Sequence, residues 1–300
     1  YHKGQHGAEV DWIGYHIQVT ATEVVAKIKE GFMKDFATWT ADIKSKNQVE
    51  IQTLRSYAGK ANHVATLVHT WRPFLDQLWA AISGSKLSNA PSHKVWVKQV
   101  SSSLSWLQAF LQQEHGVLER RWRFDYYSHQ GKKINLILDA SPFGLGGVLL
   151  VDGRIVAWFA DALTAHDVRL HGHAIGEDTG QQTWESLVVL VAVRLWGPQW
   201  KNYATTITLQ SAHMAALALA AKMKGKASKL IARELALAMS SSSFAPRFVE
   251  HVPGVMNSVS DALSRLTDPT KPYHIPEVLA GIRREVVPQR DEGYYTTLQF

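Results

Sequence analysis

Residues 134–148 read Ile-Asn-Leu-Ile-Leu-Asp-Ala-Ser-Pro-Phe-Gly-Leu-Gly-Gly-Val, and they decide the fold class of the second half of the chain. Their first part is a short apolar run that is typical of a buried strand and ends on Asp139. An acid at the end of a buried strand, beside a glycine-rich turn, lowers stability unless a cation pairs with it. Asp139 is therefore the first candidate for a functional residue.

Strand and helix patterns continue from this stretch toward the C-terminus. Asp152-Gly153 separates two further strands and is a strong hairpin signal. A loop rich in His and Gly, residues 166–180, precedes a strong helical pattern at Thr183–Trp196. The expected strands are 134–139, 146–151, 154–159, 205–209 and 244–251, and the later helices are 212–221, 227–239 and 257–266. This order predicts an α/β unit.

Two more acids stand on the expected helices, Glu185 in the first turn of the helix at Thr183–Trp196 and Asp261 in the last helix. Carboxylates that converge from strand and helix ends are suitable ligands for Mg²⁺ or Mn²⁺. A pair of such ions can hold the attacking and leaving oxygens during phosphodiester cleavage. Each acid alone also has an ordinary explanation: Asp139 can cap a turn, Glu185 can complement the helix dipole, and Asp261 can face solvent.

Three segments resemble the RNase H domains of retrotransposons. Asp139–Val148 resembles their first strand and turn, and Trp184–Ala192 looks like their first helix with its catalytic Glu. The most specific segment is His251-Val-Pro-Gly-Val-Met-Asn-Ser-Val-Ser-Asp-Ala-Leu-Ser-Arg265, which closely matches their closing sequence. The resemblance covers about Lys133–Leu266 and implies an RNase H-like fold, a mixed five-stranded sheet flanked by helices.

The resemblance also implies an activity, the endonucleolytic hydrolysis of the RNA strand of an RNA–DNA hybrid with two Mg²⁺ or Mn²⁺ ions. By that comparison Asp139 bridges both ions, Glu185 holds one and Asp261 holds the other. Recognition would rest on the shape of the hybrid and on the 2′-hydroxyl rather than on base sequence. An RNA–DNA hybrid or another duplex nucleic acid is therefore the expected partner.

One position departs from the family pattern. The family has a further Asp at the end of the fourth strand, where this chain reads Leu209-Gln-Ser-Ala-His-Met-Ala-Ala-Leu217, so Ser211 takes the place of the acid. His213 lies two residues further and is a poor substitute for a hard oxygen ligand of Mg²⁺. We expect cleavage to be impaired, and the alternative is a catalytically inactive nucleic-acid-binding remnant. Whether Glu177 or Asp178 compensates stays open.

An actin-like phosphotransfer domain is a further alternative. A strand, an Asp and a Gly-Gly turn also occur together in the phosphate loops of such domains. They require a second, duplicated Asp/Gly phosphate loop, and the sequence contains none that we recognise. This alternative is therefore the weakest of the three.

The first half of the chain is basic. Residues 1–133 hold 17 Lys and Arg against 11 Asp and Glu, whereas residues 134–300 hold 15 of each, so the whole net charge of +6 lies in the first part. Such a surface suits a polyanion, although +6 is also ordinary solvation charge for a chain of this size. We expect a strand or hairpin at 10–20 and helices at 21–45, 49–82 and about 100–111, with Pro73 interrupting the second helix.

Two stretches in this half resemble reverse transcriptases. Trp12–Ile17 is similar to the primer-grip hairpin, and Leu54–Asn62 with Trp71–Phe74 looks like the thumb helices that follow it. The similarity is closest to retrotransposons that integrate with a tyrosine recombinase. The polymerase motif Tyr-x-Asp-Asp is absent and residue 1 is not Met, so we expect the rest of a Pol polyprotein upstream. The expected segments are 1–132 as primer grip, thumb and connection, 133–266 as the RNase H-like domain, and 267–300 as an irregular tail.

Basic and aromatic residues mark candidate contacts with nucleic acid. They are Trp12, Gly14, Arg120, Arg121 and Arg123 in the first half, and Lys222, Lys224 and Lys226 between two helices of the second. The stretch 119–123 also has an ordinary explanation as a solvated helix end with a buried Trp. His166, His171 and His173 fit a polar surface loop better than a metal site, although RNase H enzymes can carry a substrate-side histidine in a mobile loop, by resemblance.

Composition excludes several classes of protein. The chain has no Cys, which rules out disulfides, thiol catalysis and Cys-based zinc sites and fits a reducing compartment. No stretch reaches the roughly 18 consecutive apolar residues of a membrane-spanning helix. We therefore expect no membrane partner and an intracellular location, in the cytoplasm or nucleus.

Overall fold

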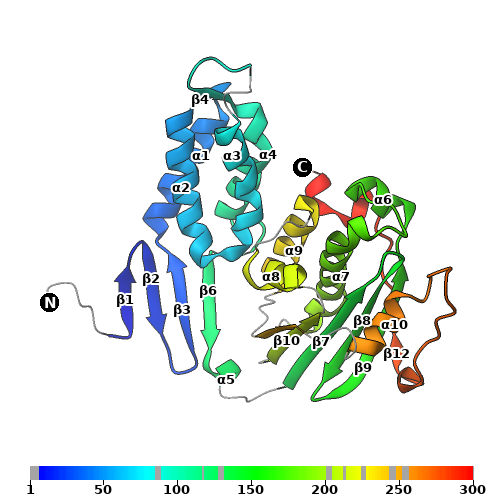
Figure 1. The fold of residues 1–300 in the computed structure, drawn as a ribbon. Coiled ribbons are helices and arrows are strands. Elements are labelled where there is room, and N and C mark those ends of the chain that lie inside the picture. The colour runs from blue at the N-terminus through cyan, green and yellow to red at the C-terminus, as the bar shows by residue number, and fades with distance from the viewer. Residues whose placement is uncertain are drawn as a thin grey trace. The chain divides into compact units, whose positions relative to one another are not determined.

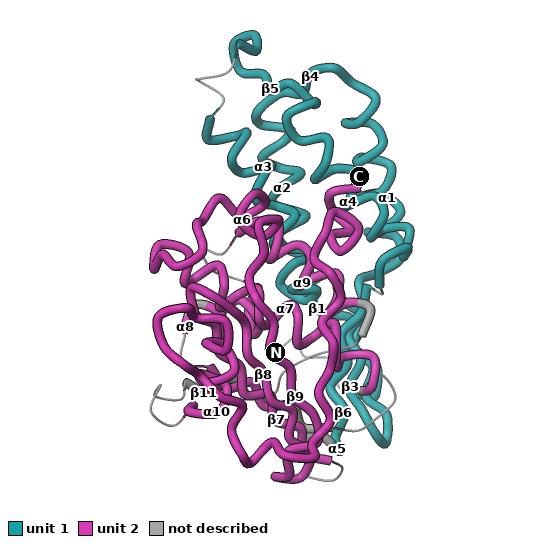
Figure 2. The backbone as a smooth tube through the Cα atoms, turned by 90° about the vertical axis from the view of Figure 1, so that its right-hand side faces the viewer, with its two compact units in different colours: residues 1–128 teal, residues 129–300 magenta. Residues whose placement is uncertain are grey.

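The computed structural model describes residues 7–84, 89–116, 118–127, 132–200, 205–211, 214–223, 228–242, 248–251 and 257–299. Figure 2 shows that the backbone divides into two compact units, residues 1–128 and 129–300. Figure 1 gives the labels of the strands and helices. Each unit has its own sheet and its own helices, so each is described by itself.

The first unit combines an antiparallel sheet with a group of helices (Figure 1). The sheet has the order β1-β2-β3-β6, and its strands are β1 (Glu9–Trp12), β2 (Tyr15–Val19), β3 (Glu23–Ile28) and β6 (Glu119–Arg123). A separate pair is formed by β4 (Gln48–Glu50) and β5 (Lys94–Trp96). The helices are α1 (Glu30–Lys44), α2 (Ile51–Leu67), α3 (Arg72–Ser83), α4 (Ser101–Leu111) and the short α5 (Phe124–Tyr127).

Aromatic side chains fill the core between these helices. The Phe36 ring stacks on Tyr57 with ring centroids 4.7 Å apart, and the Phe74 ring meets Phe110 edge-on at 4.9 Å. Such pairs stabilise a core beyond the effect of burial alone. The tryptophans of this half are therefore explained mainly by packing, as Trp106 shows with 0% exposure.

Two predictions for the first unit are confirmed. The hairpin expected at residues 10–20 is formed by β1 and β2, and its turn places Ile13 and Gly14 at φ values of +43° and +84°. Gly14 adopts this left-handed conformation without strain, because it has no Cβ. Pro73 lies in the first turn of α3, where its missing N–H costs no helical hydrogen bond.

One other expectation is wrong, and one alternative is excluded. Residues 23–28 form β3 instead of the start of a helix, and residues 119–123 form β6, so the alternative of a solvated helix end does not hold. These two strands pair with each other, with Lys27 opposite Glu119. Each strand is therefore stabilised by a partner far along the chain, which overrides the local helical pattern.

The second unit is built on a mixed sheet in the order β11-β10-β7-β8-β9-β12. β7 (Lys132–Ala140), β8 (Gly144–Val151) and β9 (Arg154–Ala162) form an antiparallel meander, and β10 (Thr205–Ser211) and β11 (Phe248–His251) run parallel to β7. The predicted α/β class, with five strands in a mixed sheet flanked by helices, is confirmed. A further strand, β12 (Arg283–Arg284), pairs with β9 from the C-terminal tail.

Helices cover both faces of this sheet (Figure 1). Trp158 and Phe159 are neighbours on β9 and therefore point to opposite faces. Trp158 packs with Leu263 of α10 (Ser258–Ser264), whereas Phe159 contacts Trp196 of α7 (Gln181–Trp196) with ring centroids 5.3 Å apart. α8 (Met214–Lys222) and α9 (Lys229–Ser242) pack against α7. Across both units, no described helix has the length and apolar sequence needed to cross a membrane.

The Gly146-Gly147 pair sets how closely the two faces can pack. A Cβ at Gly146 would lie 2.4 Å from the Ser260 carbonyl oxygen of α10, and one at Gly147 would lie 2.3 Å from the Phe159 ring. Side chains at these positions would displace α10 on one face and Phe159 on the other. The pair therefore allows α10 to pack directly on β8.

Two helix boundaries in the second unit differ from the expectation. α6 (Ala165–His171) occupies the first part of the expected loop, because Thr164 and Asp167 form a capping box at its start. α7 begins at Gln181, earlier than expected, so Glu185 lies in the second helical turn instead of the first. Both differences change where side chains near the candidate site point.

The C-terminal tail, expected to be irregular, packs on the second unit through specific contacts. The Trp158 indole donates a hydrogen bond to the Ile282 carbonyl oxygen at 3.1 Å, next to β12. Arg290 is 2% exposed, donates to Asp167 at 2.8 Å and also forms an ion pair with Asp161. The described part of the tail is largely irregular, with three short 3₁₀ helices and β12, yet it contributes buried groups to the unit.

Replacing Arg290 with Ala tests how much the tail contributes to stability. The change leaves Asp167, which is 0% exposed, as a buried and unpaired charge. Because breaking a buried ion pair in this way costs about 3–5 kcal/mol, we expect urea titrations to show a loss of that order. The control is Arg283→Ala, whose side chain is 67% exposed in its pair with Glu285 and whose loss should cost less than about 1 kcal/mol. Equal losses in the two variants would contradict an anchoring role for Arg290.

Candidate metal-binding site

Asp139 lies at the end of β7 in a nearly closed environment. Its side chain is 6% exposed and accepts hydrogen bonds from the Ser264 hydroxyl at 2.9 Å and from the Asn257 amide at 3.3 Å. Ser264 is the last residue of helix α10, and Asn257 is the residue immediately before the helix. The packing of α10 on the sheet therefore fixes the orientation of the Asp139 carboxylate.

Glu185 reaches the same end of β7 from α7. Its side chain is 2% exposed, and Oε1 accepts a hydrogen bond from the Gln181 amide at 2.9 Å. The same amide donates to the Ala140 carbonyl oxygen at 2.5 Å. Residues four apart share a helix face, so Gln181 links Glu185 to the end of the strand.

Burial and neighbouring negative charges disfavour the charged forms of both acids. Burial raises the pKa of Glu185 to about 8, and the neighbouring Asp139 carboxylate contributes to the rise. Burial also raises the pKa of Asp139 to about 6, against the effect of the Ser264 hydrogen bond, which lowers it. A cation between two such acids would favour their charged forms.

Ser211 occupies the neighbouring position of the site. β10 ends at Ser211, beyond its expected end, and lies parallel to β7 with Ser211 opposite Leu138. Ser211 is 0% exposed, and its hydroxyl donates to Glu185 Oε2 at 3.4 Å. A neutral hydroxyl therefore faces Glu185; that it replaces an acid stays a prediction. Glu177 and Asp178, considered as substitutes, are both exposed.

Asp261 is paired with a cation of its own helix. Arg265 donates from Nε to Asp261 Oδ1 at 2.7 Å, and the two side chains are 35% and 38% exposed. Asp261 still acts on Asp139, because its charge helps to raise the pKa of that carboxyl. Among the residues that the structure describes, no three His, Asp or Glu side chains form a group that could hold a metal ion. The structure thus brings Asp139 and Glu185 together and pairs Asp261 with Arg265.

Three residues that orient the two acids, Gln181, Asn257 and Ser264, are not predicted from the sequence. Asn257 and Ser264 lie within the closing sequence 251–265, in which only Asp261 is predicted as a site residue. Gln181 precedes Glu185 by one helical turn, and this spacing is the signal that could have identified it.

The predicted nucleic-acid-binding residues lie in both units. In the first unit, Trp12 is 51% exposed and lies beside Gly14 at the turn between β1 and β2. In the second unit, Lys222 is exposed at the end of α8. Three further residues of interest, Lys224, Lys226 and His213, lie outside the described residues.

The three arginines of β6 are held on their own sheet. The Arg120 guanidinium lies 5.0 Å from the centre of the Trp122 ring. Arg121 and Arg123 form ion pairs, and their side chains are 49% and 42% exposed. Ion pairs with a side chain this exposed contribute little to stability. The partners are Glu23 and Glu119 for Arg121 and Asp125 for Arg123.

The histidines of the 166–173 segment take part in packing. His171 lies edge-on to Trp184 with ring centroids 5.9 Å apart, and it is 3.4 Å from the Tyr295 hydroxyl of the tail. Burial lowers the pKa of His171 to about 4, so its ring is neutral at physiological pH. His173 lies edge-on to the same Trp184 ring at 6.1 Å, and His166 is part of α6. The segment is therefore not the polar surface loop that was expected: it begins with helix α6, and two of its histidines pack against Trp184.

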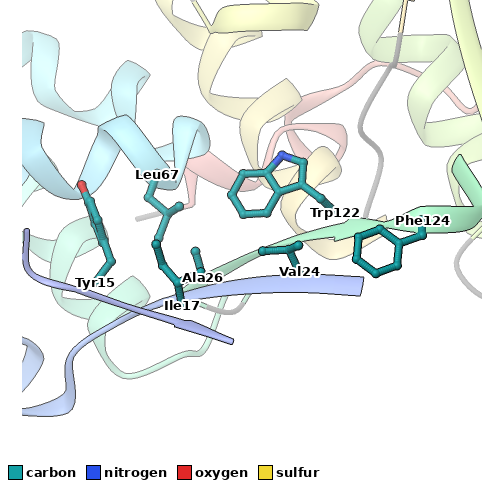
Figure 3. A pocket seen from close by; sticks show the side chains of 7 residues that line it. All are labelled: Tyr15, Ile17, Val24, Ala26, Leu67, Trp122 and Phe124. Atoms are coloured by element: carbon teal, nitrogen blue, oxygen red, sulfur yellow. The ribbon is translucent and has the colours of Figure 1, made fainter. Parts of the chain in front are cut away.

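An open apolar pocket of about 780 Å³ lies on the sheet of the first unit (Figure 3). Residues of β2, β3 and β6 line it, with one residue each from α2 and α5. The lining residues are Tyr15, Ile17, Val24, Ala26, Leu67, Trp122 and Phe124. Because none of them carries a charge, this pocket offers no ligands for a metal ion.

Comparisons with known proteins give only distant similarities. No family model matches the chain, and no curated protein matches it. Two solved structures are similar: the foamy viral protease-reverse transcriptase dRH in complex with double-stranded DNA, at 15% identity and a TM-score of 0.28, and the foamy viral protease-reverse transcriptase in complex with RNA/DNA hybrid, at 13% and 0.27. The matches cover 81% and 82% of this chain but only 38% and 30% of those chains. Similarity at this level does not by itself support a conclusion about fold or function.

Replacing Glu185 with Gln tests the cost of burying the second acid. Its pKa in the folded protein, about 8, exceeds the ordinary value of 4.5. The stability that the protonated Glu185 contributes is therefore fully present below pH 4.5. It is lost as the pH rises through the folded-state pKa of about 8. Without added metal, we expect the variant to be more stable than the unaltered chain by on the order of 1–3 kcal/mol at about pH 8.5, with little difference near pH 5.

Thermal unfolding at both pH values measures this difference. The control is Glu177→Gln, which removes an exposed acid and should produce no pH-dependent gain. A gain of equal size in both variants, or none in Glu185→Gln, would contradict the interpretation.

Proposed function

We propose that the second unit is an RNase H-like domain of a retroelement, which binds RNA–DNA hybrids or other duplex nucleic acid and cleaves the RNA strand inefficiently. The observation that supports this most strongly is the burial of Asp139 and Glu185 together at the end of β7. Two acids held in this way lower the stability of a metal-free protein, and a divalent cation compensates for it. The order of the sheet agrees with the fold that the closing sequence 251–265 implies.

The proposed ligands of Mg²⁺ or Mn²⁺ are Asp139, Glu185 and Asp261. Their carboxylate oxygens are the donors that such ions prefer, which fits the metal. When bound, the ions supply an activated water and stabilise the leaving 3′ oxygen. The chain itself supplies position: Ser264 and Asn257 orient Asp139, and Gln181 orients Glu185.

The balance of charge explains why cleavage should be inefficient. Three ionised carboxylates carry −3, whereas two divalent ions carry +4, so the proposed ligands are one negative charge short of neutralising both ions. A second ion would need further negative charge beside Glu185. Ser211 supplies a neutral oxygen there, so that ion should bind weakly.

The first unit is proposed to be the primer grip, thumb and connection of a reverse transcriptase, from a retrotransposon of the tyrosine-recombinase type. Its exposed Trp12, Gly14 and the arginines of β6 would contact phosphates and bases, together with the lysines at 222, 224 and 226 of the second unit. On this proposal the rest of a Pol polyprotein lies upstream. An intracellular location, in the cytoplasm or nucleus, is part of the same proposal.

A catalytically inactive nucleic-acid-binding remnant is the second candidate. It is favoured by the Ser211 hydroxyl, which faces Glu185 where the family pattern has a carboxylate. The two candidates share the fold and the partner and differ only in whether three carboxylates suffice for cleavage. A cleavage assay therefore separates them.

The substitution Ser211→Asp adds a carboxylate beside Glu185. We expect the unaltered chain to cleave a labelled RNA–DNA hybrid slowly in Mg²⁺, and the variant to cleave it at least about tenfold faster, because the second ion gains a ligand. Ser211→Asn, which has the same shape without the charge, should stay at the unaltered rate. Equal rates in the unaltered chain and Ser211→Asp would show that three carboxylates suffice, and no cleavage by any of them would favour the inactive remnant.

Hybrid binding measured by filter binding over a range of salt concentrations tests the nucleic-acid contacts. We expect the logarithm of affinity to fall linearly with the logarithm of salt concentration, by about 0.7–0.9 per neutralised phosphate. Changing Arg121 and Arg123 together to Gln should flatten the slope by about 1–2. The control Arg283→Gln should leave it unchanged. A slope insensitive to the paired change would remove β6 from the interface.

A further inference from the structure

The candidate site contains a cation of its own. The Arg265 guanidinium binds the Asp261 carboxylate at 2.7 Å and also acts on Asp139, whose pKa it helps to lower. These two carboxylates are proposed ligands of the metal. The arginine therefore faces the groups that a divalent ion would need.

The backbone at Arg265 is held in place, so only its side chain can leave the site. Arg265 follows the last residue of α10, and its carbonyl oxygen accepts a hydrogen bond from the Asp268 N–H at 2.9 Å. The preceding Ser264 is fixed on both sides. Its hydroxyl donates to Asp139 at 2.9 Å, and its carbonyl oxygen accepts from the Ser141 hydroxyl at 2.6 Å.

The ion pair between Arg265 and Asp261 is one that a metal ion can break. Both side chains are about one-third exposed, at 35% and 38%, so water screens their attraction. A divalent ion carries twice the charge of a guanidinium and binds carboxylate oxygens directly. Binding of the ion to Asp261 therefore exchanges a screened ion pair for coordination and leaves the guanidinium free to swing away.

We propose that Arg265 is a tethered competitor of the metal ion: its guanidinium occupies the Asp261 carboxylate in the metal-free protein and must leave it when a divalent ion binds. This inference rests on the proposed metal site, and it adds that Arg265 lowers the affinity of the site for the metal ion. The carboxylates alone would bind the ion more tightly than the chain does with Arg265 present. Ser211 already leaves the site short of negative charge, which lowers its affinity for a metal ion. Arg265 lowers that affinity further.

The test is a calorimetric titration of the full chain with Mn²⁺. In Arg265→Gln, which removes the charge and keeps a polar side chain, we expect the Mn²⁺ dissociation constant to fall about three- to tenfold. Arg265→Lys keeps a positive charge and should bind Mn²⁺ much as the unaltered chain does. Asp139→Asn should lose the binding. The matched control Lys46→Gln removes a cation from another ion pair of i, i+4 spacing, with Asp42 in the first unit, and should change nothing.

The outcomes separate this inference from the proposed function. If Asp139→Asn loses Mn²⁺ binding and Arg265→Gln binds no more tightly than the unaltered chain, the competitor role is wrong and the metal site stands. If neither the unaltered chain nor Arg265→Gln binds Mn²⁺, the metal site falls and the inference falls with it. Equal tightening in Arg265→Gln and Arg265→Lys would attribute the effect to altered packing instead of charge, and would also overturn the inference. Circular dichroism melting curves establish that each variant is folded.

Discussion

The seating of α10 on β7 and β8 is the contact on which the candidate site depends. Gly146 allows the close approach, and the Ser141 hydroxyl holds the helix through the Ser264 carbonyl oxygen. The same helix then orients Asp139 through the Ser264 hydroxyl and carries Asp261 to its neighbourhood. A change that lifts α10 would therefore disturb the fold and the chemistry together, because they use the same hydrogen bonds.

The buried acids show a conflict between stability and function. Burial raises the pKa of both acids, the Asp261 charge adds to the rise at Asp139, and the Asp139 charge adds to the rise at Glu185. Neither acid therefore gains from being charged in the absence of a bound metal ion. A protein selected only for stability would have replaced one of them by an amide or an apolar group. Their presence together is the physical reason to regard this end of the sheet as a candidate site, and the hydroxyl of Ser211 lies beside Glu185.

The sequence predicts those parts of the structure that depend on neighbouring residues. The apolar run ending at Asp139, the Asp152-Gly153 turn and the helix that carries Glu185 are all local patterns, and the structure has each of them. Strand β3 could not be predicted in this way, because its partner β6 is distant in sequence. The role of Arg290 could likewise not be predicted from neighbouring residues, because its partner Asp167 is distant in sequence and meets it only in the folded chain. For the candidate site, the strand and helix ends predict that Asp139 and Glu185 are neighbours, whereas the amide of Gln181 and the pairing of Asp261 with Arg265 require the actual side-chain positions.

The short strand β12 has a consequence for where this unit can be divided from the rest of a protein. β9 would otherwise be the outermost strand of the sheet, and an uncovered outer strand offers unpaired N–H and C=O groups to other molecules. A fragment that ended near Leu266, where the resemblance to RNase H domains ends, would keep every proposed metal ligand and lose this cover. Such a fragment would be prone to aggregation through β9 although it kept all three candidate carboxylates. The sequence resemblance and the stable folding unit therefore end at different places in this chain.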